Sequence, residues 1–187
     1  MLLLKRNSIE EGNWVAEKLE EEDYSKIGNF NCSDDDLNEF FQIDALEHKK
    51  ELLAVTYSLK MATEELPVAF ISFCNDAIQL SRQERGKLLP PKKARYQFLP
   101  AVKIARLGVQ KEFQRHNIGT KFINMAKRLF LKDNRTGCRF MTVDAYNTDR
   151  VINFYKKNDF KFLHEKDSNK KTRIMYFDLK RLEISYP

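Results

Sequence analysis

The sequence predicts an α/β fold in which a mixed β-sheet is flanked by helices. The middle of the 187-residue chain alternates β-rich runs with amphipathic helical patterns, in the order strand, helix, strand, helix, strand. This order is typical of a sheet whose faces are covered by helices. The length fits a single domain over residues 1–187. A chain of this size buries about 70% of its unfolded surface, so it needs no disulfide or metal to fold.

The first half of the chain contains the signals for a helix and a hairpin. Residues 13–19 form a first strand, and residues 32–50 form a helix that Ser33 or Asp34 can cap. The β-rich runs 52–61 and 67–74, separated by a polar segment, predict a hairpin. Residues 76–100 contain adjacent prolines and many cations, which indicates a long loop or a short helix with a loop.

The second half predicts the elements that matter most for function. An apolar strand at residues 101–109 precedes a helix at residues 118–132, in which apolar residues recur at spacings of four, three and four. A strand at residues 138–146 follows. The next helix, over residues 147–159, has Asn147 or Thr148 as its cap. Strands at residues 160–165 and 172–179 enclose a polar turn.

Charge and cysteine content narrow the class of protein. The net charge is +6, with acidic residues concentrated in the first 50 positions and cations in residues 82–139. A basic region of this kind suits an anionic partner, although a solvated basic surface is an equal alternative. The three cysteines are odd in number and far apart, which argues against disulfides and a metal site and favours the cytoplasm. No apolar run is long enough to cross a membrane.

The segment between the predicted strand and helix, Gln114 to Thr120, is rich in polar backbone. The start of a helix leaves N–H groups without partners and has partial positive charge, which suits a diphosphate. Gly119 permits close approach to the backbone, and Asn117 tolerates a positive φ. Arg115 and His116 add cationic donors. An ordinary capped turn is the alternative reading of this segment taken alone.

The run "RLGVQKEFQRHNIGTKFI" resembles the acetyl-CoA motif of the GNAT acetyltransferase superfamily, with Asn117 where that family usually has its first glycine. The resemblance implies the GNAT acyltransferase fold and acetyl-CoA as acetyl donor. It implies that the backbone around Leu107 and Val109 pairs with the pantetheine arm. It also implies a pyrophosphate site formed by Gln114, Arg115, His116, Asn117, Ile118, Gly119 and Thr120.

A second run, "VDAYNTDRVINFYKKNDFKFL", resembles the later motif of the same superfamily, with Asp159 where a glycine is common. The resemblance implies that Tyr155 is the general acid for the coenzyme thiolate; the alternative is a packing aromatic. Asn147 either bonds the pantetheine arm or caps the following helix. Together the two runs span residues 102–163 in the order and spacing of the superfamily.

A narrower resemblance is to the GNAT-type toxins of toxin–antitoxin pairs, which acetylate the α-amino group of aminoacyl-tRNA. It rests on "FNCSDDDLNEFF", the basic insert and "LPAVKIARLGV". It implies that tRNA is contacted by basic residues 82–95 and 121–128. It also implies an antitoxin protein as partner and is compatible with a homodimer. Two other functions stay open: acetylation of a small-molecule amine or a protein N-terminus, and a non-catalytic acetyl-CoA-binding module.

The strand at residues 101–109 has Lys103 and Arg106 but no acidic residue that could serve as a general base. An ordinary lysine amine has a pKa near 10.4, whereas an α-amine has one near 8 and is more easily deprotonated. The missing acid therefore favours an α-amine as acceptor. A base from another segment, such as Asp144, would remove this argument.

Overall fold

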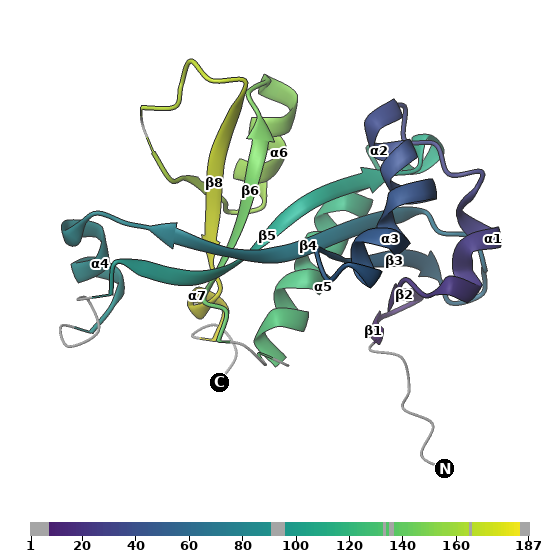
Figure 1. Cartoon of the computed structure of the whole chain (residues 1–187), viewed down its shortest axis with the longest axis horizontal. Helices are drawn as coiled ribbons and strands as arrows, with labels where there is room; N and C mark the ends of the chain where they lie inside the picture. The colour runs from purple at the N-terminus through teal and green to yellow at the C-terminus, as the bar shows by residue number, and fades with distance from the viewer. Residues whose placement is uncertain (1–7, 91–95, 133, 135–136, 165, 184–187) are drawn as a thin grey trace, which may run out of the picture. The chain divides into compact units, whose positions relative to one another are not determined.

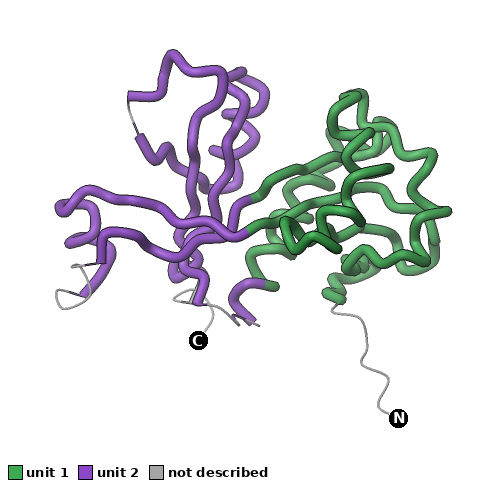
Figure 2. The backbone as a smooth tube through the Cα atoms, in the orientation of Figure 1, with its two compact units in different colours: residues 1–74, 104–129 green, residues 75–103, 130–187 purple. Residues whose placement is uncertain are grey.

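The computed structural model describes residues 8–90, 96–132, 134, 137–164 and 166–183. It divides into two compact units (Figure 2). Unit 1 contains residues up to 74 and residues 104–129, and unit 2 contains residues 75–103 and those from 130 onwards. Figure 1 labels most of the helices and strands, numbered in chain order.

Within the described residues, eight strands form one hydrogen-bonded sheet in the order β1-β2-β3-β4-β5-β6-β8-β7. The strands are β1 (Ser8–Glu11), β2 (Trp14–Lys18), β3 (Val55–Met61), β4 (Ala69–Gln79), β5 (Phe98–Val109), β6 (Phe140–Tyr146), β7 (Lys161–Phe162) and β8 (Thr172–Asp178). The α-helices are α1 (Tyr24–Ile27), α2 (Asp35–Glu39), α3 (Ala45–Lys50), α4 (Arg82–Leu88), α5 (Ile118–Lys132), α6 (Asp149–Lys157) and α7 (Lys180–Glu183). The predicted mixed sheet with flanking helices is confirmed.

Unit 1 contains an antiparallel series of strands, because β1 pairs with β2, β2 with β3 and β3 with β4. The helix predicted at residues 32–50 is present in three parts, with a π-helical turn at Phe40–Asp44 between α2 and α3. Of the two predicted caps, Asp34 is the one that accepts a bond from the Leu37 N–H, at 3.1 Å. Ser33 instead has a φ of 64°.

Phenylalanines form the centre of unit 1. The rings of Phe41 and Phe70 stack at 4.4 Å between centroids, and Phe30 contacts both edge-on. Phe70 lies on β4, and its ring reaches the backbone of Gly108 on β5: a Cβ added at Gly108 would lie 2.5 Å from a ring carbon. Packing against this cluster therefore requires a glycine in β5, immediately before the turn that leads to α5.

Unit 2 is built on β6, which pairs antiparallel with β8, and on β7, which also pairs antiparallel with β8. Helix α6 packs against β6. A buried cluster joins β4, β5 and β6 of this unit through Ile78, Leu99 and Phe140. The segment at residues 76–100 differs from the predicted loop, because β4 extends to Gln79 and β5 begins at Phe98. The alternation of apolar residues Ile78 and Leu80 was the missed signal for this extension.

Because Phe70 packs closely on Gly108, we expect the stability of the protein to fall when a side chain is added at position 108. Gly108→Ala should destabilise the protein by about 1–3 kcal/mol, the usual cost of adding a methyl group to a packed core. Gly86→Ala is the matched control. Gly86 is inside α4, where an added Cβ meets no atom within 4 Å, so alanine should be neutral or stabilising by up to about 1 kcal/mol. Chemical denaturation of the three proteins tests this, and equal stability of Gly108→Ala and wild type would contradict it.

Candidate functional site

The turn between β5 and α5 has the backbone of an anion site. Arg115 and Asn117 both adopt left-handed conformations, with φ of 65° and 60°. A left-handed residue beside a right-handed one turns successive backbone N–H groups towards one concave side, and Arg115 and Asn117, separated by His116, each provide a left-handed position of this kind. The carbonyl of Asn117 accepts the N–H of Lys121 at 2.9 Å, so the N–H groups of residues 118–120 precede the α-helical hydrogen-bond ladder. The positive φ predicted for Asn117 is confirmed, whereas that of Arg115 had no signal in its residue type.

Two glutamine side chains hold this turn in place. Gln114 donates from Nε2 to the carbonyls of Cys32, at 2.8 Å, and Val109, at 3.1 Å. Gln110 accepts the N–H of Asn31 on Oε1 at 2.8 Å. Both contacts lie within unit 1. The side chain of Gln114 therefore fixes the turn to the loop before α2 through its Nε2 donors.

The residues around the turn differ in their accessibility. Arg115, His116 and Asn117 are exposed, Gln114 and Thr120 are half-buried, and Ile118 and Gly119 are buried in the first turn of α5. On the strand before the turn, Leu107 and Val109 are half-buried on either side of the buried Gly108. The structure thus brings the predicted pyrophosphate and pantetheine residues of unit 1 into one continuous stretch of strand, turn and helix.

The cations predicted to contact tRNA are not equally available. On α5, Lys127 is only 3% exposed, Arg128 is ion-paired with Glu11, and Lys121 is half-buried. Lys127 is therefore not a surface cation as predicted, because it lies on the buried face of the helix. On α4, Arg82 and Lys87 are exposed. Residues 91–95, which include three of the predicted cations, lie outside the described residues.

Tyr155 lies on α6, in unit 2, and is buried. Its ring contacts Phe154 and Phe160 edge-on, at 5.1 and 5.3 Å between centroids. Burial raises the pKa of the Tyr155 phenol well above its usual range, so the hydroxyl keeps its proton at neutral pH. Within the described part of the chain, no group is hydrogen-bonded to that hydroxyl. A protonated phenol of this kind is a donor available to a ligand.

Asn147, also in unit 2, connects the end of β6 to the polar turn before β8. Its side-chain amide donates to the carbonyls of Ser168 and Lys170 at 2.7 and 3.1 Å. The α6 N-cap is Thr148, whose side chain makes no capping bond. The predicted capping role of Asn147 is therefore wrong, because its amide is used across the turn. Asp159, in the position where the GNAT motif has a glycine, has a φ of 64°.

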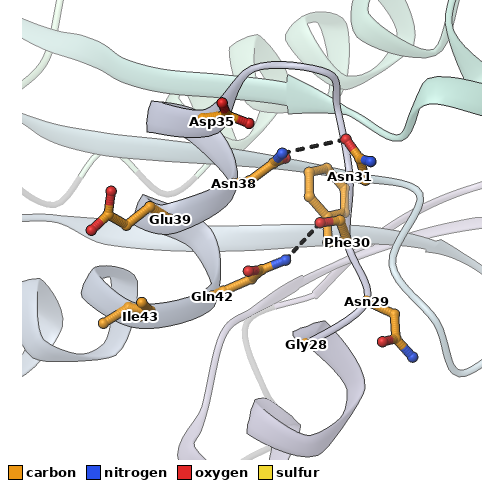
Figure 3. A pocket seen from close by; sticks show the side chains of 9 residues that line it. All are labelled: Gly28, Asn29, Phe30, Asn31, Asp35, Asn38, Glu39, Gln42 and Ile43. Carbon is orange, nitrogen blue, oxygen red and sulfur yellow. Dashed lines mark hydrogen bonds between the residues drawn. The ribbon is translucent and has the colours of Figure 1, made fainter.

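An open pocket of about 520 Å³ lies beside α2 in unit 1 (Figure 3). Amide side chains shape it: Asn38 donates to Asn31 at 3.3 Å, and Gln42 donates to the carbonyl of Phe30 at 2.7 Å. Asp35 and Glu39 make its lining acidic. No sequence pattern predicted this pocket, because the amides occur on a helix and a loop that only the fold brings together.

No group of three or more His, Cys, Asp or Glu side chains in the described part of the chain is arranged to hold a metal ion. None of its helices combines the length and apolarity needed to span a bilayer.

Comparison with solved structures identifies the fold class. The chain has the mixed α/β GNAT acyltransferase fold seen in toxin structures of toxin–antitoxin systems, which confirms the fold that the sequence predicted. At the level of sequence, no family model and no curated protein matches the chain.

Three solved structures show the extent of the likeness. AtaT complexed with acetyl-methionyl-tRNAfMet matches with a TM-score of 0.75 and 19% identity, over 93% of this chain and 99% of that chain. AtaTR bound with acetyl-CoA matches at 0.69 and 19% identity, over 95% and 100%. A tyrosine-to-phenylalanine mutant of KacT matches at 0.74 and 17% identity, over 93% and 99%. The chain is thus similar to these proteins along nearly their full length.

Proposed function

We propose that this protein is an acetyl-CoA-dependent N-acetyltransferase that acetylates the α-amino group of aminoacyl-tRNA, in the manner of a toxin. The observation that supports this best is the left-handed turn at Arg115 and Asn117, between β5 and the 15-residue helix α5. It lies in a fold shared with AtaT, a structure of which contains acetyl-methionyl-tRNAfMet. The turn is at the position where the sequence motif requires a pyrophosphate site.

The residues present fit acetyl-CoA. The exposed Arg115 and His116 and the N–H groups at the start of α5 would hold the diphosphate. The backbone of Leu107 and Val109 would pair with the pantetheine amides like an added strand. Asn147 would bond the same arm through its side-chain oxygen, because its NH₂ group is already used by the turn before β8. When bound, acetyl-CoA supplies the activated acetyl group as a thioester.

Tyr155 supplies the proton that the reaction must deliver. Transfer of the acetyl group breaks the carbon–sulfur bond, and the departing thiolate needs a proton. The buried phenol of Tyr155 holds its proton at neutral pH. Its ring is fixed between Phe154 and Phe160, so the hydroxyl does not have to be ordered during the reaction.

The acceptor is proposed from the basic surface and from the likeness to AtaT, which was solved with acetyl-methionyl-tRNAfMet. The exposed Arg82 and Lys87 on α4 are available for phosphates. By analogy with AtaT bound to the C-terminus of the antitoxin AtaR, we also propose an antitoxin partner. We propose further that residues 1–187 form a single acetyltransferase domain. Because aminoacyl-tRNA is found in the cytoplasm, we propose the cytoplasm as the location of the protein.

Acetyl-CoA affinity should depend on Arg115. Arg115→Glu should raise the acetyl-CoA dissociation constant at least about tenfold, because it replaces a charged hydrogen bond worth about 1.5–3 kcal/mol with repulsion. Arg82→Glu makes the same charge change on α4 and should leave this constant unaltered. Calorimetry on both variants measures the effect. Unchanged affinity of a folded Arg115→Glu protein would remove the diphosphate from this turn.

Tyr155→Phe should fold normally and lose turnover. The ring is retained, so packing survives, but loss of the general acid should reduce single-turnover transfer by roughly 10²- to 10⁴-fold. Tyr24→Phe, at an exposed tyrosine of α1, is the matched control. Rates are measured at saturating acetyl-CoA beside melting curves. A Tyr155→Phe rate within about threefold of wild type would assign the ring a packing role only.

The acceptor is tested directly with radiolabelled acetyl-CoA and three candidates: aminoacyl-tRNA, a peptide with a free N-terminus and a small amine. We expect transfer to aminoacyl-tRNA, with affinity that falls steeply as salt increases, because phosphate contacts release counterions. The double variant Arg82→Glu, Lys87→Glu should weaken tRNA binding and reduce the salt slope. Transfer to the small amine or the peptide alone would replace the proposed acceptor, and no transfer to any of them would indicate a binding module.

A further inference from the structure

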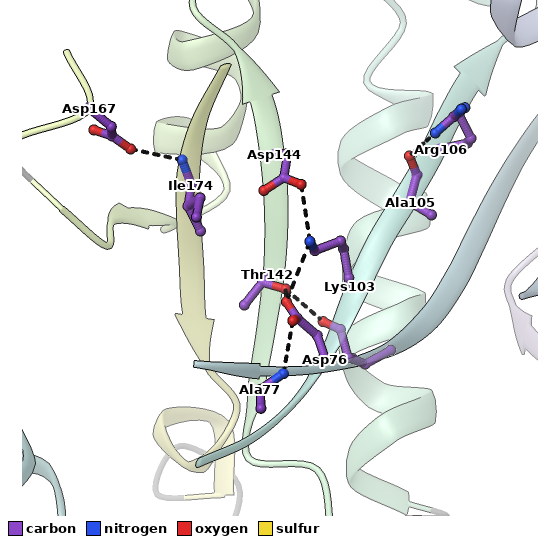
Figure 4. Close-up of polar contacts among 10 residues, drawn as sticks. Asp76, Ala77, Lys103, Ala105, Arg106, Thr142, Asp144, Asp167 and Ile174 are labelled. Atoms are coloured by element: carbon purple, nitrogen blue, oxygen red, sulfur yellow. Dashed lines mark hydrogen bonds and ion pairs between the residues drawn. The ribbon is translucent and has the colours of Figure 1, made fainter. Parts of the chain in front are cut away.

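Three strands of unit 2 bring together a polar cluster that the proposed function does not yet use (Figure 4). Lys103 of β5 is hydrogen-bonded to Oδ2 of Asp144 on β6 at 3.0 Å and lies 3.9 Å from Oδ2 of Asp76 on β4. Asp76 also accepts the hydroxyl of the buried Thr142 at 2.6 Å and the N–H of Ala77 at 2.8 Å. The acid that β5 itself lacks is therefore supplied by both neighbouring strands.

The two carboxylates are in different situations. Asp76 uses both oxygens within the cluster, and its side chain is 23% exposed. The side chain of Asp144 is 44% exposed. Only Oδ2 of Asp144 is bonded to another group of the described chain, so Oδ1 is not engaged there. The carboxylates of Asp76 and Asp144 and the ammonium group of Lys103 together have a net charge of −1. Asp144 is the more exposed of the two carboxylates, so it is the one that a ligand can reach.

Side chains alternate between the two faces of the sheet along β6. Asp144 lies on one face, and Tyr155 of α6 packs on the other. Tyr155 contacts Phe160, which packs on Phe177 of β8 at 5.9 Å. Phe177 is the register partner of Met141, so this face contains the odd-numbered residues of β6. Asp144 is on the even-numbered face. The protein thus has a proton donor on one face and an exposed proton acceptor on the other.

We propose that Asp144 binds the ammonium group of the acetyl acceptor and removes its proton, with Lys103 and Asp76 positioning the carboxylate. This inference rests on the proposed acetyltransferase function and deepens it. The acceptor R–NH₃⁺ gives one proton to Asp144. The resulting R–NH₂ forms a bond to the thioester carbonyl carbon as the carbon–sulfur bond breaks. The thiolate takes the proton of Tyr155, and the second amine proton is lost to solvent. Asp144 then releases its proton to solvent and the Tyr155 phenolate takes one up, which restores both groups.

The charges around Asp144 favour this role. Lys103 from β5 contacts both Asp144 and Asp76 of β4, and Tyr176 of β8 lies on the same face of the sheet, opposite Thr142. Burial raises the pKa of the Tyr176 phenol, so that group stays neutral. Tyr146, two residues further along β6, is also on this face. An incoming ammonium would convert a cluster with one unbalanced negative charge into a neutral one, while a second anion would be repelled.

Asp144→Asn tests the proposal, because asparagine keeps the bond to Lys103 and removes only the charge. With an acceptor whose α-amine has a pKa near 8, we expect the rate at pH 6.5 to fall by roughly 30-fold or more, within the range of general base catalysis. The deficit should narrow towards pH 9, where the amine is already neutral. Acetyl-CoA affinity and melting temperature should not change. Asp159→Asn is the matched control, because it removes the same charge at an exposed, left-handed position that asparagine tolerates. Its transfer rate should equal that of wild type at both pH values.

The outcomes separate this proposal from the function on which it rests. If wild type transfers acetyl and Asp144→Asn loses the same factor at pH 6.5 and pH 9, the residue has a structural role and the proposal is wrong. A rate for Asp144→Asn equal to wild type at both pH values also overturns it, while leaving the acetyltransferase function intact. Failure of the wild-type protein to acetylate any amine, with acetyl-CoA bound, overturns the function and this proposal with it.

Discussion

The contact between the Phe70 ring and the backbone of Gly108 is the constraint on which unit 1 depends. Phe70 connects the rings of Phe30 and Phe41 to strand β5. Any side chain at position 108 would push that strand away from the aromatic cluster. The strand ends one residue later, and the turn with Arg115 and Asn117 follows. The placement of this turn therefore depends first on core packing and then on the two glutamine bonds that attach it to the loop before α2.

Strand β5 combines structural and chemical roles along its length. Near its start Leu99 is buried in the apolar cluster of unit 2. Lys103 then joins the carboxylates of the neighbouring strands, and Gly108 closes against Phe70. A strand with polar groups at its centre would be costly if those groups had no partners. Here the ammonium of Lys103 and both oxygens of Asp76 have partners within the cluster. The second carboxylate oxygen of Asp144 is left for a ligand.

Local sequence patterns were sufficient to predict the elements whose conformation depends mainly on their own residues. The bounds of α5 follow from its apolar spacing, and the left-handed Asn117 follows from its residue type. Features that depend on partners distant in sequence could not be predicted. The burial of Lys127, the bonds from Gln114 to Cys32, the amide bonds of Asn147 and the pairing of Lys103 with Asp144 all require knowledge of which segments become neighbours. The strand itself has no acid, as its sequence shows, and the alternative that Asp144 of another segment lies nearby is the one that the fold confirms.

The π-helical turn at Phe40–Asp44 has a consequence for how this region tolerates length changes. Its wide turn lets two consecutive residues, Phe40 and Phe41, both be buried in the core. Removing one residue here would convert the wide turn into a regular α-helical turn while the helical segments on either side keep their register, because a π-helical turn holds one residue more than an α-helical one. Asp35 and Asn38 on one side and Ala45 and Leu46 on the other would keep their present faces, and the loss would fall on the joint burial of Phe40 and Phe41. Homologues that lack one residue at this turn should therefore keep the adjoining pocket and differ in the aromatic core.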